Sequence, residues 1–459
     1  MRNFPLRSCS PQNTFWLPMI SLRLLLVSAS ILVALSVSAC NNKADESAAR
    51  PAKPFVEWTN DLGATAVPQQ LINGSGNWYV PAKIEGLDLK TPLWERDVST
   101  LGLTRYASAA GRVFFIGSKG YAGALDAATG QTIWEVTPKI GLVDDAGTPV
   151  ELAVTKRSLI IATSRPAGNG ELRFLKPGNG ELLRTEQVDY EIAQLIAADG
   201  RIFAISDTGE ITSFSETDGS QIAEAHQVTG LQDVTVCEDR LVFYGREMAA
   251  FSLDMATLKP LGARVFEQRM NCLFSMGGEL LMFAVDKAEM VALDPRTLEV
   301  NWRRPLESKA NMLPAGFDSK LFLGEEGGKL RCLDLMTGKY AWTREIEASC
   351  YVFIVFDNCV LAIADYPPDN SSQLGQRQRP ETPPKAPSWY KGNGAHNYSL
   401  FVLSTADGST IAQFTGDGYL LPQCVTDKGI IVREDPAGTL ACYPYQLEAQ
   451  GAKTGGSAK

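Results

Sequence analysis

The sequence contains only two histidines, His226 and His396, among its 459 residues. Histidine is the commonest metal ligand and a frequent general base, so this scarcity argues against zinc sites, catalytic triads and histidine acid–base chemistry. The chain also lacks a dense cluster of Lys and Arg, and its net charge is −9. Proteins that bind nucleic acid need basic surface to offset the phosphates, so we expect no nucleic-acid partner.

Two cysteine patterns are also missing, because the sequence has no Cys-x-x-Cys and no adjacent Cys pair. Besides Cys9 and Cys40, the cysteines are Cys237, Cys272, Cys332, Cys350, Cys359, Cys424 and Cys442. An oxidising compartment would permit disulfides, but an odd number of cysteines cannot all pair within one chain. Most of them lie among strand-like apolar residues, so we expect buried structural thiols and leave the disulfide state open.

Long apolar runs are absent except near the start of the chain, so nothing else is expected to span a bilayer. Residues 24–37 are almost entirely apolar, follow Arg23, and lead into Val37-Ser38-Ala39-Cys40. An apolar core followed by small residues predicts a secretory signal. The last four residues resemble the lipobox of bacterial lipoproteins, which implies cleavage before Cys40 and a lipid on that cysteine.

Three points about this segment stay open. A plain signal anchor with an incidental cysteine is the alternative, and Met19 is a second candidate for the start of the chain. Asn41 follows the cysteine where an Asp would, by resemblance to enteric lipoproteins, favour the inner membrane. We therefore expect a protein anchored in the outer membrane by its N-terminal lipid and facing the periplasm of a Gram-negative bacterium.

A motif recurs at intervals of about 40 residues, which is typical of β-propeller blades. Its complete form is Leu-Asp-x-x-Thr-Gly-x-x-x-Trp, in which Trp follows Asp by eight positions, as from Asp126 to Trp134. The positions that hold the Asp or its replacement are Asp126, Lys176, Ser215, Asp254, Asp294, Asp334, Ser404 and Pro444.

Each copy contains four short segments with the period-2 alternation of strands. The third and fourth segments of one copy, for example, are expected at 329–334 and 339–344. We therefore predict an all-β fold, an eight-bladed propeller of four-stranded antiparallel blades. A ninth unit at 86–89 is the alternative, but its Asp88 precedes Trp94 by only six positions.

The conserved spacing of the motif has a local explanation. Asp126 and Thr129 can accept backbone N–H groups in a turn, Gly130 supplies positive φ, and Trp134 offers apolar area for the next blade. No ligand is needed for any of these roles. We therefore assign the motif to structure, and name no catalytic, cofactor-binding or metal-binding residue.

The last copy has three strands before a Gly/Lys/Ala-rich end, so a fourth strand has to come from elsewhere. Residues 92–98 resemble that strand, because Trp94 stands at the position that Trp occupies in the motif, here called the Trp place. Closing the last blade with this strand would remove an open sheet edge. The predicted organisation is a signal peptide at 1–39, a flexible tether at 40–54, an N-terminal extension at 55–91, the propeller at 92–446 and a disordered tail at 447–459.

A Pro-rich insertion at about 366–397 interrupts the seventh copy, and its end carries Trp389 and Tyr390. Long loops in compact folds tend to be functional or disordered. These two aromatic residues are our candidates for contact with a partner. A solvated excursion is the alternative.

The repeat is similar to that of quinoprotein-like (PQQ-repeat) β-propellers, over about residues 92–445. One branch consists of periplasmic dehydrogenases that bind pyrroloquinoline quinone and calcium, with a vicinal disulfide that this chain lacks. The other branch consists of lipoproteins of the BamB type, which assist assembly of outer-membrane β-barrels. The lipobox and the closed ring favour the second branch.

The expected function is thus a non-catalytic, lipid-anchored scaffold without cofactors. Its partner would be an envelope protein, with the β-barrel assembly complex as the candidate. Two alternatives stay open: a quinone-dependent dehydrogenase, and an envelope binding module that uses the 366–397 insertion.

Overall fold

The computed structural model describes residues 78–80, 83–88, 91–366 and 397–446, apart from short gaps at 102, 118–120, 137–147, 165–167, 227–229, 277, 311–313, 318, 326–327, 347–348, 417–418 and 436–437. Within these ranges the chain forms strands and turns and no helix. Accordingly, no described helix is long and apolar enough to cross a membrane. All described strands belong to one compact unit, Ala52–Lys459.

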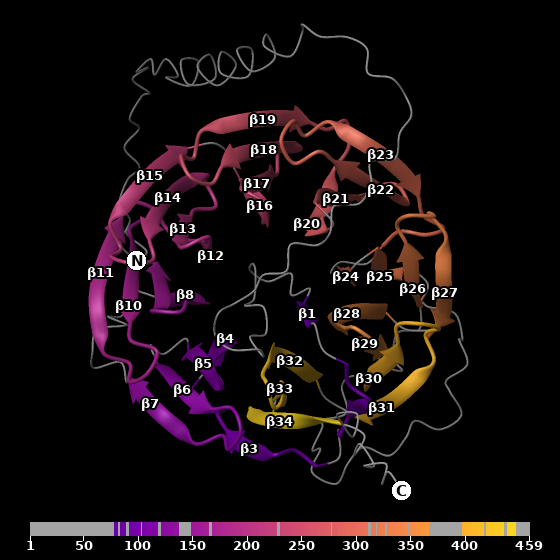
Figure 1. The fold of residues 1–459 in the computed structure, drawn as a ribbon, viewed down its shortest axis with the longest axis horizontal. Helices are drawn as coiled ribbons and strands as arrows, with labels where there is room; N and C mark the ends of the chain where they lie inside the picture. Colours follow the sequence, from indigo (N-terminus) through magenta and orange to yellow (C-terminus); the bar gives the residue numbers. More distant parts are fainter. Residues whose placement is uncertain are drawn as a thin grey trace, which may run out of the picture. The chain divides into compact units, whose positions relative to one another are not determined.

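The strands form eight sheets, each built on four antiparallel strands, and the sheets are arranged as the blades of a ring (Figure 1). The inner strands of blades 1 to 8 are β4 (Leu103–Ala109), β8 (Thr148–Val154), β12 (Gln194–Ala198), β16 (Leu231–Cys237), β20 (Met270–Met276), β24 (Ala315–Phe317), β28 (Ser349–Phe356) and β32 (Tyr419–Val425). The second strands are β5 (Arg112–Gly117), β9 (Leu159–Ser164), β13 (Arg201–Ile205), β17 (Arg240–Gly245), β21 (Glu279–Ala284), β25 (Lys320–Glu325), β29 (Cys359–Tyr366) and β33 (Gly429–Asp435).

The third strands are β6 (Ala122–Asp126), β10 (Gly170–Leu175), β14 (Glu210–Ser215), β18 (Ala249–Asp254), β22 (Glu289–Leu293), β26 (Lys329–Asp334), β30 (Asn397–Ser404) and β34 (Thr439–Gln446). The outer strands are β7 (Thr132–Val136), β11 (Leu182–Val188), β15 (Gln221–His226), β19 (Pro260–Val265), β23 (Val300–Pro305), β27 (Tyr340–Glu345), β31 (Thr410–Gly416) and, in blade 8, β3 (Trp94–Asp97). The predicted eight-bladed propeller is confirmed.

The hydrophobic core lies between the blades. The buried apolar side chains form eight clusters, and each cluster joins two neighbouring blades around the ring. Successive side chains of a strand point to opposite faces of its sheet, so each blade contributes to the cluster on either side of it. This explains why the second strands are apolar along most of their length, as in the buried run Val113 to Ile116.

The N-terminal part of the chain completes blade 8. β3 pairs antiparallel with β34, with Trp94 opposite Cys442 and Asp97 opposite Thr439. The predicted closure of the last blade by an N-terminal strand is therefore confirmed. β2 (Gly86–Leu87) pairs with β34 further along, Leu87 opposite Tyr445. Residues 86–87 thus extend blade 8 and do not begin a ninth.

A further short strand, β1 (Trp78–Val80), runs parallel to the inner strand β28 of blade 7. Between β1 and β2, the Asn358 side chain accepts the Ile84 N–H at 3.0 Å and donates to the Ile84 carbonyl at 2.7 Å. Ile84 and Leu87 are buried in the cluster between blades 7 and 8. The described residues between 78 and 97, here called the N-terminal strap, therefore pair with blade 7 and with blade 8, and Ile84 and Leu87 pack between the two.

Candidate functional site

The recurring Asp-x-x-Thr-Gly segment closes the hairpin between the third and outer strands. In blade 1, Asp126 Oδ1 accepts the N–H of Ala128 at 3.1 Å, the N–H of Thr129 at 2.8 Å and the Thr129 hydroxyl at 2.9 Å. The hydrogen bond from the Thr129 hydroxyl is the main cause that lowers the Asp126 pKa. Gly130 follows at φ 68°, a conformation that favours glycine.

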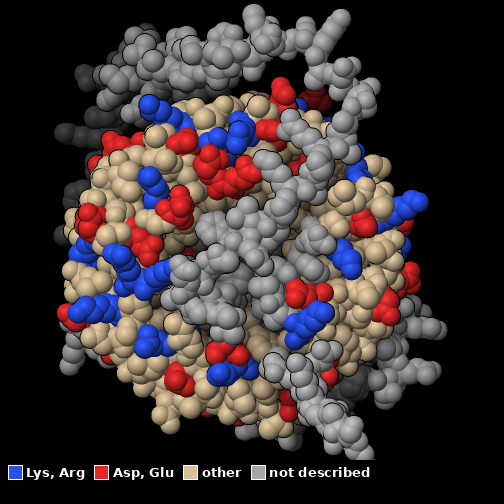
Figure 2. All heavy atoms as spheres, in the orientation of Figure 1, with Lys and Arg blue, Asp and Glu red and all other residues tan. Residues whose placement is uncertain are grey.

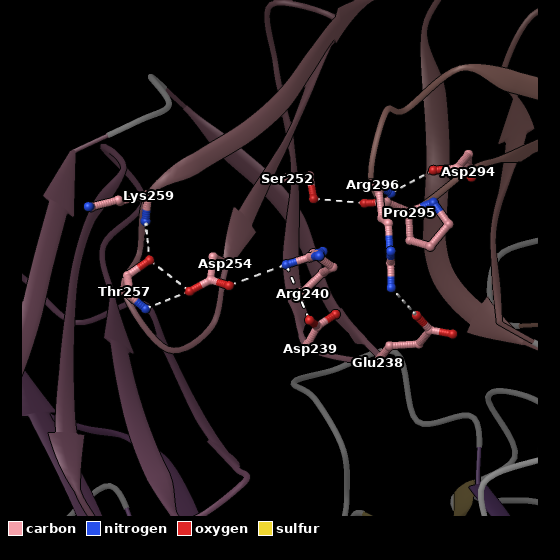
Figure 3. Close-up of polar contacts among 10 residues, drawn as sticks. All are labelled: Glu238, Asp239, Arg240, Ser252, Asp254, Thr257, Lys259, Asp294, Pro295 and Arg296. Atoms are coloured by element: carbon pink, nitrogen blue, oxygen red, sulfur yellow. Dashed lines mark hydrogen bonds and ion pairs between the residues drawn. The ribbon is translucent and has the colours of Figure 1, made fainter.

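The same carboxylate geometry recurs in other blades (Figure 3). Asp254 accepts from the N–H and the hydroxyl of Thr257 at 2.8 and 2.7 Å, and Arg240 lies 3.3 Å from its other oxygen. Where the Asp is replaced by serine, the Ser215 hydroxyl accepts backbone N–H groups of its turn. These side chains are engaged by their own hairpins, so they serve as turn-forming groups.

In blades 8, 1 and 6, the tryptophan in the Trp place binds the hairpin of the next blade. The indole N–H of Trp94 donates to the Ala127 carbonyl of blade 1 at 2.9 Å. Trp134 and Trp342 donate in the same way to blades 2 and 7. A Cβ on Gly130 would come within 2.5 Å of the Trp94 ring. Gly130 is therefore required twice, by its backbone conformation and by the indole that covers it.

Two blades replace this Trp–Gly pair with a different one. Leu258 and Leu298 occupy the Gly place with φ of 54° and 58°, and both are buried. The residues in the Trp place of the preceding blades are small, Ala223 and Gly262. Ala223 packs against the cluster that contains Leu258. The leucine thus fills the volume that a tryptophan occupies elsewhere, which offsets the strain of its backbone.

Sequence reasoning missed an arginine two positions after the Trp place. These arginines donate to carbonyls in the hairpin of the next blade, and they are Arg96, Arg264, Arg304 and Arg344. In blade 5 the arginine, and not the tryptophan, makes the contact with the next blade. The indole N–H of Trp302 donates to Glu279 of its own blade at 3.0 Å, while Arg304 reaches Leu335 at 3.1 Å. The recurring sequence Trp-x-Arg is the signal from which this contact between blades could have been predicted.

A buried ionic network lies in blade 6. Glu325 is 0% exposed and Arg331 is 1% exposed, and Arg331 Nε lies 3.1 Å from Glu325 Oε2. Ser308 and Tyr340 donate their hydroxyls to Glu325 at 2.5 and 2.8 Å. Arg331 also donates to Glu307 at 2.6 Å. Burial is the main cause that raises the Tyr340 pKa to about 12. This network fixes the connection between blades 5 and 6.

Asp233 links the inner strands of blades 4 and 5. Its two carboxylate oxygens accept the N–H of Val234 at 2.9 Å and the N–H of Leu273 at 2.8 Å. Burial raises the pKa of Asp233 to about 6. The cause is the cost of keeping a charged carboxylate away from water, which the two backbone donors offset only in part.

This raised pKa predicts a pH dependence of stability. The folded protein binds the Asp233 proton more tightly than the unfolded chain does. The resulting stabilisation is complete below about pH 4 and is lost as pH rises through 6. Between pH 4 and 7, wild type should lose about 2 kcal/mol of unfolding free energy relative to Asp233→Asn. Urea denaturation of both proteins at the two pH values measures this, and parallel changes in the two would contradict it.

The residues proposed from sequence as functional lie outside the described residues. This holds for Cys40, Trp389 and Tyr390. The insertion that carries Trp389 and Tyr390 falls between β29 and β30, the second and third strands of blade 7. Six of the seven remaining cysteines are buried and unbridged, as expected for structural thiols. Burial raises the pKa of Cys237 to about 11, which disfavours the reactive thiolate.

The surface in Figure 2 carries acidic and basic side chains interspersed around the ring. The described residues visible on that face form no extended basic area of the kind that follows a phosphate backbone.

The fold is an eight-bladed β-propeller, and the comparisons support the resemblance of its repeat to PQQ-repeat propellers. More particularly, a sequence profile described as outer membrane protein assembly factor BamB matches residues 118–271, about a third of the chain. Among curated proteins, no sequence matches the chain.

Solved structures share the fold at low sequence identity. BamB from Moraxella catarrhalis is 12% identical with a TM-score of 0.50, over 78% of this chain and 98% of that one. Quinohemoprotein alcohol dehydrogenase ADHIIG from Pseudomonas putida HK5 is 10% identical with a TM-score of 0.52, over 83% of each chain. Sqt1 from Saccharomyces cerevisiae is 12% identical with a TM-score of 0.53, over 78% of this chain and 100% of that one. This likeness establishes the fold alone.

The dehydrogenase branch of such repeats would imply a calcium-bound quinone as cofactor. Calcium takes about 6–8 oxygen ligands. In the part of the chain that the structure describes, no three His, Cys, Asp or Glu side chains gather in a way that could hold a metal ion. The Asp126 and Asp254 carboxylates are held by their own turns.

Proposed function

We propose that this chain is a non-catalytic, lipid-anchored scaffold that assists assembly or delivery of outer-membrane β-barrel proteins. The observation that carries the proposal is the match of residues 118–271 to the profile of an outer membrane protein assembly factor. The lipobox that ends at Cys40 supports it, because it would tether the propeller to the membrane in which such barrels are assembled.

The chemistry of the hairpins also supports a scaffold over a dehydrogenase. The Asp of the repeat can be replaced by Ser215 or Ser404, and the turn persists with a hydroxyl as acceptor. A repeat that tolerates this exchange is selected for turn geometry. A rigid ring with loops on both faces offers many separate contact surfaces to envelope proteins.

The test is deletion of the gene followed by quantitative proteomics of outer membranes. We expect lower levels of β-barrel proteins, restored by the wild-type gene and not by Cys40→Ala, which removes the lipid attachment. The matched control is Cys9→Ala, which lies before the lipobox. Unchanged barrel levels in the deletion strain, together with no assembly factor co-purifying from solubilised membranes, would refute the proposal.

We further propose that Trp389 and Tyr390 contact the partner. The Trp389→Ala/Tyr390→Ala double variant should fold like wild type and recover less partner in affinity purification. Undiminished recovery would remove these residues from the interface.

A further inference from the structure

The outer strand of blade 4, β19, differs from the other seven outer strands at one position. The residue that follows the Trp place is exposed in every blade and is polar in seven of them: Glu95, Glu135, Thr185, Glu224, Arg303, Thr343 and Gln413. In β19 this residue is Ala263. The neighbours on the same side of the strand are apolar and exposed as well, Leu261 by 43% and Val265 by 62%.

A polar or charged residue in the middle of an edge strand is the usual protection against pairing with another chain. Every outer strand except β19 has such a residue at this place, and in β19 Pro260 protects only the first position of the strand. β19 lies on the outside of the ring (Figure 1), and within the described ranges it pairs only with β18. Its outward side chains are Leu261, Ala263 and Val265, without a charge among them.

The register of β18 and β19 defines which backbone groups face the open edge. Phe266 donates its N–H to the Met248 carbonyl at 2.8 Å, so residue 266 is a hydrogen-bonded position of the ladder. Hydrogen-bonded and non-hydrogen-bonded positions alternate in an antiparallel pair. The backbone N–H and C=O groups of Arg264 therefore point toward β18. The same groups of Ala263 and Val265 point away from β18, toward the open edge.

We propose that the free edge of β19 is a docking site for an extended polypeptide strand whose residues alternate between apolar and polar. The edge offers unpaired backbone groups to any extended chain, and its two sides select the pattern. Apolar residues of an added strand would lie beside Leu261, Ala263 and Val265. Its polar residues would lie on the side of Gly262 and Arg264.

This alternation is the pattern of strands that form outer-membrane β-barrels, in segments of about ten residues. The inference therefore rests on the proposed function, and it names both the class of substrate and the place where it binds. A second copy of this chain is the competing occupant, because β19 could pair antiparallel with itself about Ala263.

The test uses the purified chain and two labelled peptides of about ten residues. One alternates valine and threonine, and the other has the same composition with the valines grouped. Fluorescence anisotropy measures their affinity for wild type, for Ala263→Lys, and for Thr343→Lys, the matched change in blade 6. Both substitutions are at exposed positions, and thermal denaturation checks that the variants remain folded.

We expect the alternating peptide to bind wild type more tightly than the grouped one. Ala263→Lys should weaken its binding about tenfold or more, because a charged side chain then lies among the apolar ones. Thr343→Lys should leave the affinity unchanged. Equal weakening by the two variants, or equal affinity for the two peptides, would overturn the proposal. So would a wild-type dimer that Ala263→Lys converts to a monomer, because the edge would then belong to a second copy.

Failure of the docking site and failure of the proposed function give different results. If gene deletion lowers barrel levels while Ala263→Lys binds the peptide like wild type, the function stands and the docking site falls. If deletion leaves barrel levels unchanged while the peptide result holds, β19 binds strands but the assembly role falls.

Discussion

Replacing Trp94 with alanine is expected to lower the free energy of unfolding by about 3–5 kcal/mol. Trp94 is 8% exposed, its ring covers Gly130, and its indole N–H donates to the Ala127 carbonyl. It lies on β3, which closes blade 8 against β34. The variant therefore loses core packing and a buried hydrogen bond at the point where the ring is joined. Urea denaturation monitored by circular dichroism measures the change.

Trp302→Ala is the matched control for this prediction. Trp302 occupies the same place in blade 5, but it is partly exposed and its N–H bonds within its own blade. Arg304 already supplies the contact to blade 6. We therefore expect a smaller loss of stability, about 1–2 kcal/mol. Equal losses for the two variants would show that closure of the ring gives Trp94 no special importance.

The second large effect is expected from Arg331→Met. The substitution leaves the Glu325 carboxylate fully buried, with the hydroxyls of Ser308 and Tyr340 as donors and without the Arg331 cation beside it. Removal of one partner from a buried ion pair costs about 3–5 kcal/mol. The double variant Arg331→Met/Glu325→Leu removes both charges and should be more stable than the single variant. Urea denaturation of the three proteins tests this order.

An exposed ion pair provides the comparison. Lys176 Nζ lies 2.6 Å from Glu181 Oε2, and both side chains are about half exposed. Exposed pairs contribute about 0–1 kcal/mol because water already solvates both charges. Lys176→Met should therefore change stability little. A double variant in blade 6 that is less stable than Arg331→Met alone would contradict the view that the unpaired buried charge is the main cost.

The blades could be predicted because each one is a local unit repeated along the chain. The third strand expected at 329–334 is β26, Lys329–Asp334, because the hairpin residues and the alternation of apolar residues specify it within one copy. The closing strand at 92–98 could be predicted from the Trp94 place. The fold follows from short-range patterns that recur, which is why the sequence of a single chain is sufficient to predict it.

The N-terminal strap could not be predicted in the same way. β1 pairs with β28, and Asn358 holds Ile84, across a long separation in the sequence that no periodicity specifies. The Glu325 and Arg331 network has the same character, because two charges in central strands are recognisable as a pair only once the sheet aligns them. For the candidate site, the difference between Ala263 and the polar residues at the same position of the other outer strands appears only when the outer strands are aligned.

The N-terminal strap also determines the order in which the parts of this protein can become native. Seven blades form from neighbouring segments, so each can fold without waiting for a distant part of the chain. Blade 8 cannot, because β3 must wait for β34 at the other end of the propeller, with Trp94 opposite Cys442. Pairing across so long a loop slows folding and leaves unpaired edges exposed in the meantime. The last step of folding is therefore the non-local closure of blade 8, and a chain held open at that step is the form that chaperones and proteases would encounter.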